Sequence, residues 1–289
     1  MRYVRPGTVD EAVSLLNSEP ESCVFAGATD LVPQMQGGRP EPKLMIDLKG
    51  IPRLVKVSYS NGQLVVGAAT PVSIVKVDDN LKAAFPGLSE SSGLIGSDQI
   101  QNRASLGGNL CTASPGADTI PSLMVNSARV VIASSGGTRT IPVSDVVTGP
   151  GSVSLKSNEF VVEFILDAPP KRTADAYLRF IPRTEMDIAV VDAAARLTLD
   201  DADCCTEALV AIGAAAPTVV RAPVAENALR GNPINDETLA EVMAAASAAC
   251  SPISDKRGTK EYRRQVAGVL AKRVVLQAAK RAKEKGGAV

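Results

Sequence analysis

The sequence contains no histidine and no tryptophan, and only 3% of its 289 residues are aromatic. Without histidine, the Ser-His and Cys-His catalytic arrangements are excluded, and so are the commonest zinc sites. Any chemistry must therefore come from a bound cofactor or from other side chains.

Cysteines are few and lack the spacing of a metal site; they are Cys23, Cys111, Cys204, Cys205 and Cys250. The adjacent pair at 204 and 205 suits neither a disulfide nor a shared metal ion. The odd count and the lack of a secretory signal favour a reducing compartment. We therefore expect a cytoplasmic protein.

Long apolar runs are also missing, because no run approaches the roughly 20 residues that span a bilayer. Charges of the two signs balance at 31 each, so no net field favours nucleic acid. The chain is 45% hydrophobic and long enough to bury sizeable cores, which suggests two domains rather than one. Basic residues that cluster at 280–285 are expected to form a solvated helix face.

The first segment predicts a small parallel unit. Thr8 and Glu11 have the spacing of a capping box before an apolar helical stripe. A short buried strand at 23–25 ends in a turn of small residues, and a helix begins at Leu31. The next strand covers 43–48, so the order is β–turn–α–β.

The second segment opens with a hairpin at Asn61-Gly62, a dipeptide that tolerates positive φ. Thr70 and Pro71 predict a helix start, with threonine as the N-cap. We further expect a helix at 80–93, a loop over most of 95–123, and strands at 130–133 and 160–166. A domain boundary is predicted at 169–171, followed by strands at 189–199 and 208–212 and by helices at 237–249 and 262–283.

Residues 25–31, FAGATDL, form the first of two glycine turns. A strand that ends in small residues and leads at once into a helix leaves free backbone N–H groups, which can hold a diphosphate. Gly27 permits close approach of the backbone, and Thr29 adds a hydroxyl donor. The alternative is an ordinary structural turn that binds nothing.

The second turn spans 104–110 and contains Gly107 and Gly108 with serine and asparagine donors. Asp118, shortly after it, has the chemistry to accept hydrogen bonds from ribityl or ribose hydroxyls. The alternative is a glycine-rich structural loop in which Asp118 caps a helix at 120–126. Neither turn matches the Rossmann fingerprint or the P-loop.

Three stretches together resemble the medium, FAD-binding subunit of the molybdenum hydroxylase family, which includes xanthine and carbon monoxide dehydrogenases. They are FAGATDL at 25–31, IGSDQIQNRASLGGNLCTASPGAD at 95–118 and RFIPRTEMDIAVV at 179–191. The similarity runs from Tyr3 to the C-terminal helix. The order of the two turn motifs and the distance between them make the resemblance specific.

The resemblance implies an α+β fold with two α/β subdomains that clamp an extended FAD (PCMH-type FAD-binding), at 1–56 and 57–172. A C-terminal domain with a three-stranded antiparallel sheet and helices would cover 173–289. The implied diphosphate cradle, with Leu31 and Leu106 as neighbours, is Ala26, Gly27, Ala28, Thr29 and Asp30 on one side and Ser105, Gly107, Gly108 and Asn109 on the other.

The resemblance also implies that Asp118 binds the sugar part, that Ile95 packs near the flavin or adenine, and that Arg179 lies by the isoalloxazine. Ala28 departs from the glycine or asparagine of many relatives. Cys111 is either a redox thiol beside the flavin or a small buried packing residue, and the second reading is favoured.

In such relatives the reaction is divided among subunits. A molybdenum pterin cofactor on a large subunit hydroxylates the substrate, and two [2Fe-2S] clusters on a small subunit relay electrons to FAD. A dimer of such heterotrimers is the expected assembly, with no residue of this chain acting on the substrate. The alternative is a stand-alone FAD-dependent oxidase with its own substrate site. Many of those attach flavin through histidine or cysteine; this chain has no histidine, and its C-terminal domain is too short for their usual substrate cap.

Overall fold

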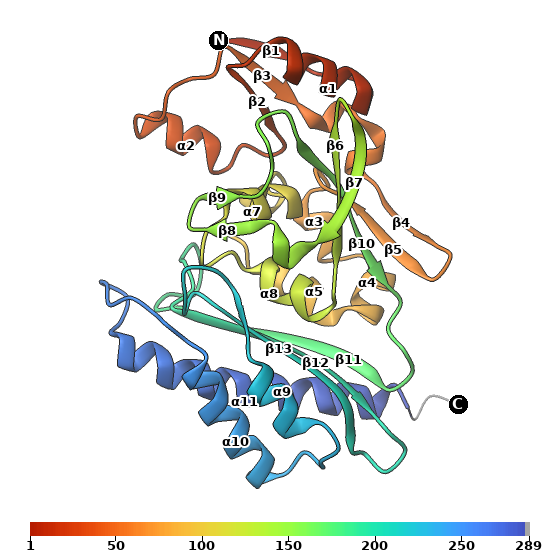
Figure 1. The fold of residues 1–289 in the computed structure, drawn as a ribbon, viewed down its shortest axis with the longest axis vertical. Helices are drawn as coiled ribbons and strands as arrows, with labels where there is room; N and C mark the ends of the chain where they lie inside the picture. Colours follow the sequence, from red (N-terminus) through yellow and green to blue (C-terminus); the bar gives the residue numbers. More distant parts are fainter. Residues whose placement is uncertain (287–289) are drawn as a thin grey trace.

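The computed structural model describes residues 1–286, which form three main sheets that follow one another along the long axis (Figure 1). The N-terminal sheet is parallel, with the order β1 (Arg2–Val4), β3 (Leu44–Asp47) and β2 (Ser22–Phe25). Helix α1 (Val9–Ser18) packs on this sheet, and α2 (Leu31–Gln36) follows β2. The predicted parallel unit is therefore confirmed.

The predicted capping box of α1 is only half formed. The Thr8 hydroxyl accepts a hydrogen bond from the Glu11 N–H at 3.1 Å. The Glu11 carboxylate, however, accepts from the N–H of Gly7 at 2.8 Å and not from Thr8. The predicted bond from the Thr8 N–H to Glu11 was wrong, because the Glu11 side chain reaches one residue further back, to Gly7.

The middle sheet is antiparallel, with strand order β4-β5-β10-β6-β7. Its strands are β4 (Val57–Ser60), β5 (Gln63–Gly67), β6 (Arg129–Ser134), β7 (Gly137–Pro142) and β10 (Phe160–Asp167). The predicted hairpin turn is confirmed, with φ of 53° at Asn61 and 72° at Gly62. The central strand β10 is buried on both faces: Val161 and Phe164 enter one core, and Phe160 and Val162 enter the core of the first unit.

Short helices surround this sheet, and three expectations about them were wrong. They are α3 (Val72–Val75), α4 (Asp79–Ala84), α5 (Pro86–Gly93), α6 (Asp98–Gln101), α7 (Leu106–Thr112) and α8 (Thr119–Val125). The predicted helix at 80–93 is two helices, because Pro86 lacks an N–H and begins a new one. Residues 95–123, predicted as loop, hold α6, α7 and most of α8. Thr70 is no N-cap: its buried hydroxyl donates to the Leu54 carbonyl at 3.5 Å.

Connecting elements complete this half of the chain. Three 3₁₀ turns and a two-stranded ribbon are present: η1 (Leu48–Gly50), η2 (Pro52–Val55), η3 (Val143–Asp145), β8 (Val147–Gly149) and β9 (Ser152–Val153).

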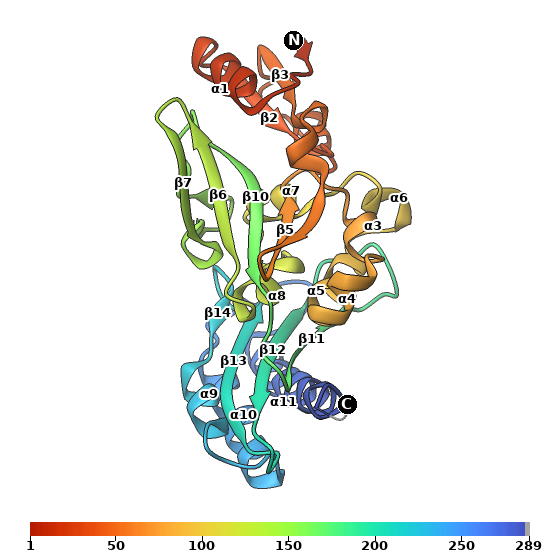
Figure 2. The same ribbon diagram turned by 90° about the vertical axis from the view of Figure 1, so that its right-hand side faces the viewer.

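The C-terminal sheet is antiparallel, with three long strands and one short one. They are β11 (Thr173–Phe180), β12 (Val191–Leu199), β13 (Cys205–Gly213) and the two-residue β14 (Val220–Arg221). The predicted three-stranded sheet thus gains a fourth strand. Helices α9 (Pro223–Leu229), α10 (Asp236–Ala248) and α11 (Lys260–Glu284) cover one face, while α5 and α8 lie on the other (Figures 1 and 2). Within residues 1–286, no helix combines the length and the apolarity needed to cross a membrane.

Buried polar contacts tie the C-terminal sheet to the middle unit. The Asp175 carboxylate on β11 accepts from the Gly87 N–H at 3.0 Å and from the Asn126 amide at 2.6 Å. Arg281 of α11 pairs with Glu90 of α5 and donates to the Asp175 carbonyl at 3.0 Å. These contacts hold β11 beside α8 and the segment that follows the second glycine turn.

Candidate functional site

The first glycine turn presents a row of unused backbone donors. Within residues 1–286, the five N–H groups from Gly27 to Leu31 have no acceptor in the protein. Ala28 adopts the left-handed conformation with φ of 58°, a strain of about 1–2 kcal/mol for a residue with a Cβ. This explains why glycine or asparagine suits the position, and it turns successive N–H groups toward one side.

Lys49 contacts this turn through its side chain, and no local sequence pattern selects it as a site residue. Its ammonium donates to the Ala26 carbonyl, lies 2.5 Å from an oxygen of Asp47, and sits 4.6 Å from the centre of the Phe25 ring. Burial lowers the pKa of Lys49 below its ordinary value, against the attraction of Asp47. Lys49 thus holds the Ala26 carbonyl at the start of the row of unused N–H groups.

The two glycine turns touch each other at Gly27. A Cβ placed on Gly27 would lie 1.9 Å from the backbone carbonyl oxygen of Arg103. A second link joins Thr112, at the end of α7, to the carboxylate of Asp30 at 3.1 Å. The predicted elements of the site are therefore brought together, with Arg103 and Thr112 as contacts that the sequence analysis missed. Their only signal was their place inside the second motif.

The glycines of the second turn have different roles. The Gly107 N–H donates to the Ala68 carbonyl at 3.0 Å, and a Cβ there would lie 2.6 Å from the same oxygen. Gly107 is thus a packing residue whose N–H is already used. Gly108 is exposed, and a Cβ on it would meet only the Ser105 hydroxyl, at 3.4 Å. Ser105 caps α7 by accepting from the Gly108 N–H at 3.1 Å.

Other predicted residues of this turn hold the local fold. Leu106 is fully buried in the core of the middle unit. The side-chain oxygen Oδ1 of Asn109 accepts from the Thr119 N–H at 3.2 Å and from the Thr119 hydroxyl at 2.6 Å. Asn109 therefore fixes the start of α8 and the position of Asp118.

Asp118 and Arg179, predicted as separate cofactor contacts, pair with each other. One guanidinium nitrogen of Arg179 lies 3.1 Å from each oxygen of Asp118, and the Arg179 side chain is only 4% exposed. The Tyr177 hydroxyl lies 3.0 Å from Asp118 as well. Burial raises the pKa of Asp118 above its ordinary value, although the charge of Arg179 opposes this. The pair joins α8 to β11 across the two halves of the molecule.

Ile95 and Cys111 lie in different environments, the first buried and the second exposed. Ile95 is buried in the core beneath α5, and its carbonyl accepts from the Gln101 side chain at 3.0 Å. Cys111 is exposed, so the favoured reading of a buried packing residue was wrong. Desolvation by the surrounding protein nevertheless raises the pKa of its thiol to about 12. Cys111 lies on α7, which begins in the second glycine turn.

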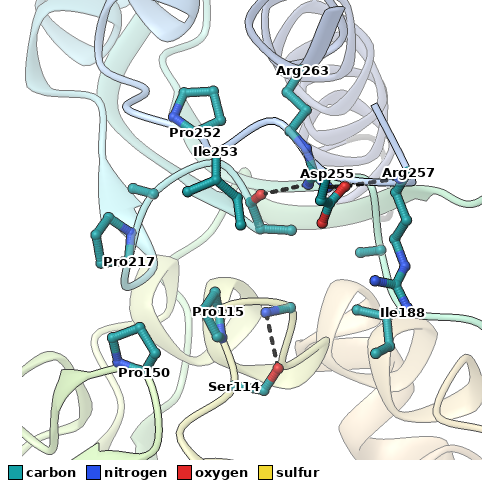
Figure 3. Close-up of a pocket in the computed structure, with 14 residues that line it drawn as sticks. Ser114, Pro115, Pro150, Ile188, Pro217, Pro252, Ile253, Asp255, Arg257 and Arg263 are labelled. Carbon is teal, nitrogen blue, oxygen red and sulfur yellow. Dashed lines mark hydrogen bonds and ion pairs between the residues drawn. The ribbon is translucent and has the colours of Figure 1, made fainter. Parts of the chain in front are cut away.

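A cavity of about 240 Å³ opens between the halves of the chain, next to the second motif (Figure 3). Pro115 and Ile188 line it, together with Pro252, Asp255 and Arg263. No residue of the first turn contributes to its lining. Because ligand pockets typically measure about 300–1,000 Å³, this cavity is too small to enclose a dinucleotide. The surface where the two turns meet lies outside this cavity.

Comparison with known families decides what binds there. The model of the FAD binding domain in molybdopterin dehydrogenase matches residues 1–169, and that of the CO dehydrogenase flavoprotein C-terminal domain matches residues 176–278. The chain belongs to the FAD-binding subunits of the molybdenum hydroxylases. It is therefore a component of an oxidoreductase, and its cofactor is FAD.

Relatives match along nearly their whole length. The putative xanthine dehydrogenase FAD-binding subunit of Escherichia coli K12 is 30% identical over 96% of this chain and 95% of its own. The carbon monoxide dehydrogenase medium chain of Afipia carboxidovorans is 30% identical, with 97% of each chain covered. The solved carbon monoxide dehydrogenase of Hydrogenophaga pseudoflava superposes with a TM-score of 0.93, at 30% identity, over 97% of this chain and 98% of that one. The α+β fold predicted from the motifs is thus confirmed.

FAD fits the residues that the structure brings together. The unused N–H groups of the first turn suit the negative oxygens of a diphosphate, and the open space at Gly108 allows close backbone approach from the second turn.

Gly108→Ala tests this placement of the diphosphate. Alanine favours a helix over glycine by about 1 kcal/mol, and no close contact prevents it here. We expect the FAD-free chain to become more stable while its affinity for FAD falls about tenfold.

The measurements are urea unfolding of the FAD-free chain and titration of FAD fluorescence. Gly93→Ala is the matched control, because Gly93 also lies in a helix and its nearest neighbour, Lys76, is 3.7 Å away. That control should gain stability without losing affinity. Unchanged FAD affinity in Gly108→Ala would place the diphosphate elsewhere.

Proposed function

We propose that this chain is the electron-transfer component of a heteromeric molybdenum hydroxylase. When bound, FAD accepts electrons from the [2Fe-2S] clusters of a small subunit, after a molybdenum cofactor on a large subunit has hydroxylated the substrate, and releases them to an external acceptor. The observation that carries this proposal is the contact of the two glycine turns at Gly27 and Arg103. This contact places the unused N–H donors of the first turn next to α7, whose Gly108 is open to solvent.

The chain's own residues supply position and electrostatics. Ala26 to Leu31 present donors, and Lys49 keeps their backbone in place. Ser105 and Asn109 fix the two helices that follow the second turn. For Asp118 and Arg179 we propose a place beside the sugar and ring portions of FAD, where their mutual ion pair fixes both side chains before the cofactor arrives.

Further parts of the proposal concern organisation. We propose three units at 1–56, 57–172 and 173–289, the last three residues lying outside the described part. Separate cores support this division, although Phe160 and Val162 of the second unit complete the core of the first. A dimer of heterotrimers is the proposed assembly. A cytoplasmic location is supported by five cysteines that are all free thiols.

The deciding experiment compares the chain purified alone and with its co-purifying subunits. Among residues 1–286, no group of three or more cysteine, aspartate or glutamate side chains is arranged to hold a metal ion. The substrate that reduces the complex should therefore leave the flavin of the isolated chain oxidised, whereas dithionite should bleach both samples. Absorbance of the flavin reports each result. Bleaching of the isolated chain by substrate would replace this proposal with a stand-alone oxidase.

A further inference from the structure

The Tyr177 hydroxyl lies between two buried carboxyl groups. It is 3.0 Å from Oδ1 of Asp118 and 3.3 Å from Oδ2 of Asp192. All three residues are less than 9% exposed. A phenol carries one hydrogen and can donate to only one carboxylate. The other contact is a hydrogen bond only if that carboxyl is protonated and donates to the phenol oxygen.

The surroundings decide which carboxyl holds the proton. Asp118 faces Arg179, whose nitrogen contacts both of its oxygens, so Asp118 is the ionised partner. Asp192 has no cation bonded to it, and its Oδ1 makes no hydrogen bond of normal geometry within residues 1–286, although the Gly213 N–H is near. Burial raises the pKa of Asp192 well above its ordinary value, and the charge of Asp118 adds to this.

Other charged side chains near this cluster have hydrogen-bond or ion-pair partners of their own. Along the same face of β11, Asp175 is bonded to Gly87 and Asn126. On β12, Arg196 pairs with Glu207 at 3.4 Å. Helix α8, which covers the cluster, contains no titratable side chain. One cation therefore faces two carboxyl groups in a dry site, an arrangement that a single proton neutralises.

We infer that Asp192 is a neutral carboxylic acid that donates to Tyr177, that Tyr177 donates to ionised Asp118, and that this relay positions Arg179. Tyr177 and Asp192 are thus positioning residues, and the one proton they share is held at Asp192 Oδ2. That Arg179 borders FAD rests on the proposed function. The relay itself belongs to the FAD-free chain, so the two can fail separately.

Infrared spectroscopy of the FAD-free chain at about pH 7 tests where the proton lies. The carbonyl stretch of a protonated carboxyl should disappear in Asp192→Asn and persist in Arg179→Met/Asp118→Asn, which removes both neighbouring charges. A band that persists in Asp192→Asn but disappears in the double variant, or that is missing from the parent chain, would overturn the assignment.

The pH dependence of unfolding gives a second measure of the same proton. The pKa of Asp192 is raised in the folded chain. Above about pH 4 this carboxyl therefore holds more protons in the folded state than in the unfolded state, and its contribution to stability falls as pH rises. Asp192→Asn should remove this fall. The variant and the parent chain should then share one urea midpoint at acidic pH, with the variant higher at alkaline pH. If the urea midpoint of Asp192→Asn instead falls below that of the parent chain as pH rises, Asp192 is ionised in the folded chain and stabilises it as an anion.

Nuclear magnetic resonance of the arginine side chain tests the positioning role. Within residues 1–286, the Nε–H of Arg179 is buried without a hydrogen-bond partner, so its signal reports the orientation of the guanidinium. Asp192→Asn keeps a donor toward Tyr177 and should keep this signal, whereas Tyr177→Phe breaks the relay and should shift or broaden it. An unchanged Arg179 signal in folded Tyr177→Phe would overturn the positioning role.

Discussion

Gly27→Ala is expected to lower the affinity for FAD by roughly 100-fold or more. The new methyl group would lie 1.9 Å from the Arg103 carbonyl oxygen and 3.0 Å from the Ala104 nitrogen, both of which are backbone atoms that cannot rotate away. The two turns must therefore separate. Losing two charge-assisted hydrogen bonds to the diphosphate, at about 1.5–3 kcal/mol each, gives an effect of this size.

Affinity should be measured by fluorescence titration on protein whose secondary structure is confirmed by circular dichroism. Overpacking alone costs about 1–3 kcal/mol of stability, so unfolding by urea must be followed in parallel. Gly93→Ala is again the control, since its added methyl meets nothing closer than 3.7 Å. A Gly27→Ala chain that is folded and keeps parental affinity would refute the contact between the turns as the basis of the site.

Arg179→Met should be the most destabilising single change at the seam between the halves. Methionine removes the cation that neutralises Asp118, whose side chain is 11% exposed. Breaking a buried pair by removing one partner costs about 3–5 kcal/mol. Since Asp118 is then unpaired, its folded-state pKa rises further, and the loss should be smallest at acidic pH and grow toward neutral pH.

Urea unfolding of the FAD-free chain across this pH range measures the loss. The double variant Arg179→Met/Asp118→Asn removes both charges and should recover most of the stability at neutral pH. A single variant whose loss is the same at acidic and neutral pH, or a double variant that recovers nothing, would mean that the Asp118–Arg179 ion pair does not hold the seam.

Local patterns were enough for the parts of the fold that depend on neighbouring residues. Asn61-Gly62 predicts its hairpin because both residues tolerate positive φ, and the apolar spacing at 262–283 predicts a helix that the structure extends to 260–284. The helix named at 120–126 is α8 at 119–125, whereas α6 and α7 were missed because they are only four and seven residues long. Such helices show less than two full turns of apolar periodicity, and contacts with the sheet stabilise them.

The candidate site also contains features that local sequence predicts and features that depend on distant partners. The sequence indicates both glycine turns, because glycine and small residues at a strand end have a local meaning. It does not distinguish Gly107, which packs on Ala68, from Gly108, which is open. It also does not reveal Lys49 beneath the first turn or the pairing of Asp118 with Arg179. Each of these depends on a partner distant in sequence, which no local pattern specifies.

The contact at Gly27 and Arg103 also dictates when the cofactor can enter. Gly27 lies in the loop after β2 and Arg103 lies between α6 and α7, far apart along the chain, so their meeting requires closure of a long loop. Contacts of high sequence separation form late, because the entropy of loop closure must be overcome first. A chain emerging from the ribosome passes its first turn long before its second, and has no FAD site in between. On the proposed placement of FAD against both turns, its insertion follows folding of the N-terminal half, and every newly made subunit passes through a flavin-free stage.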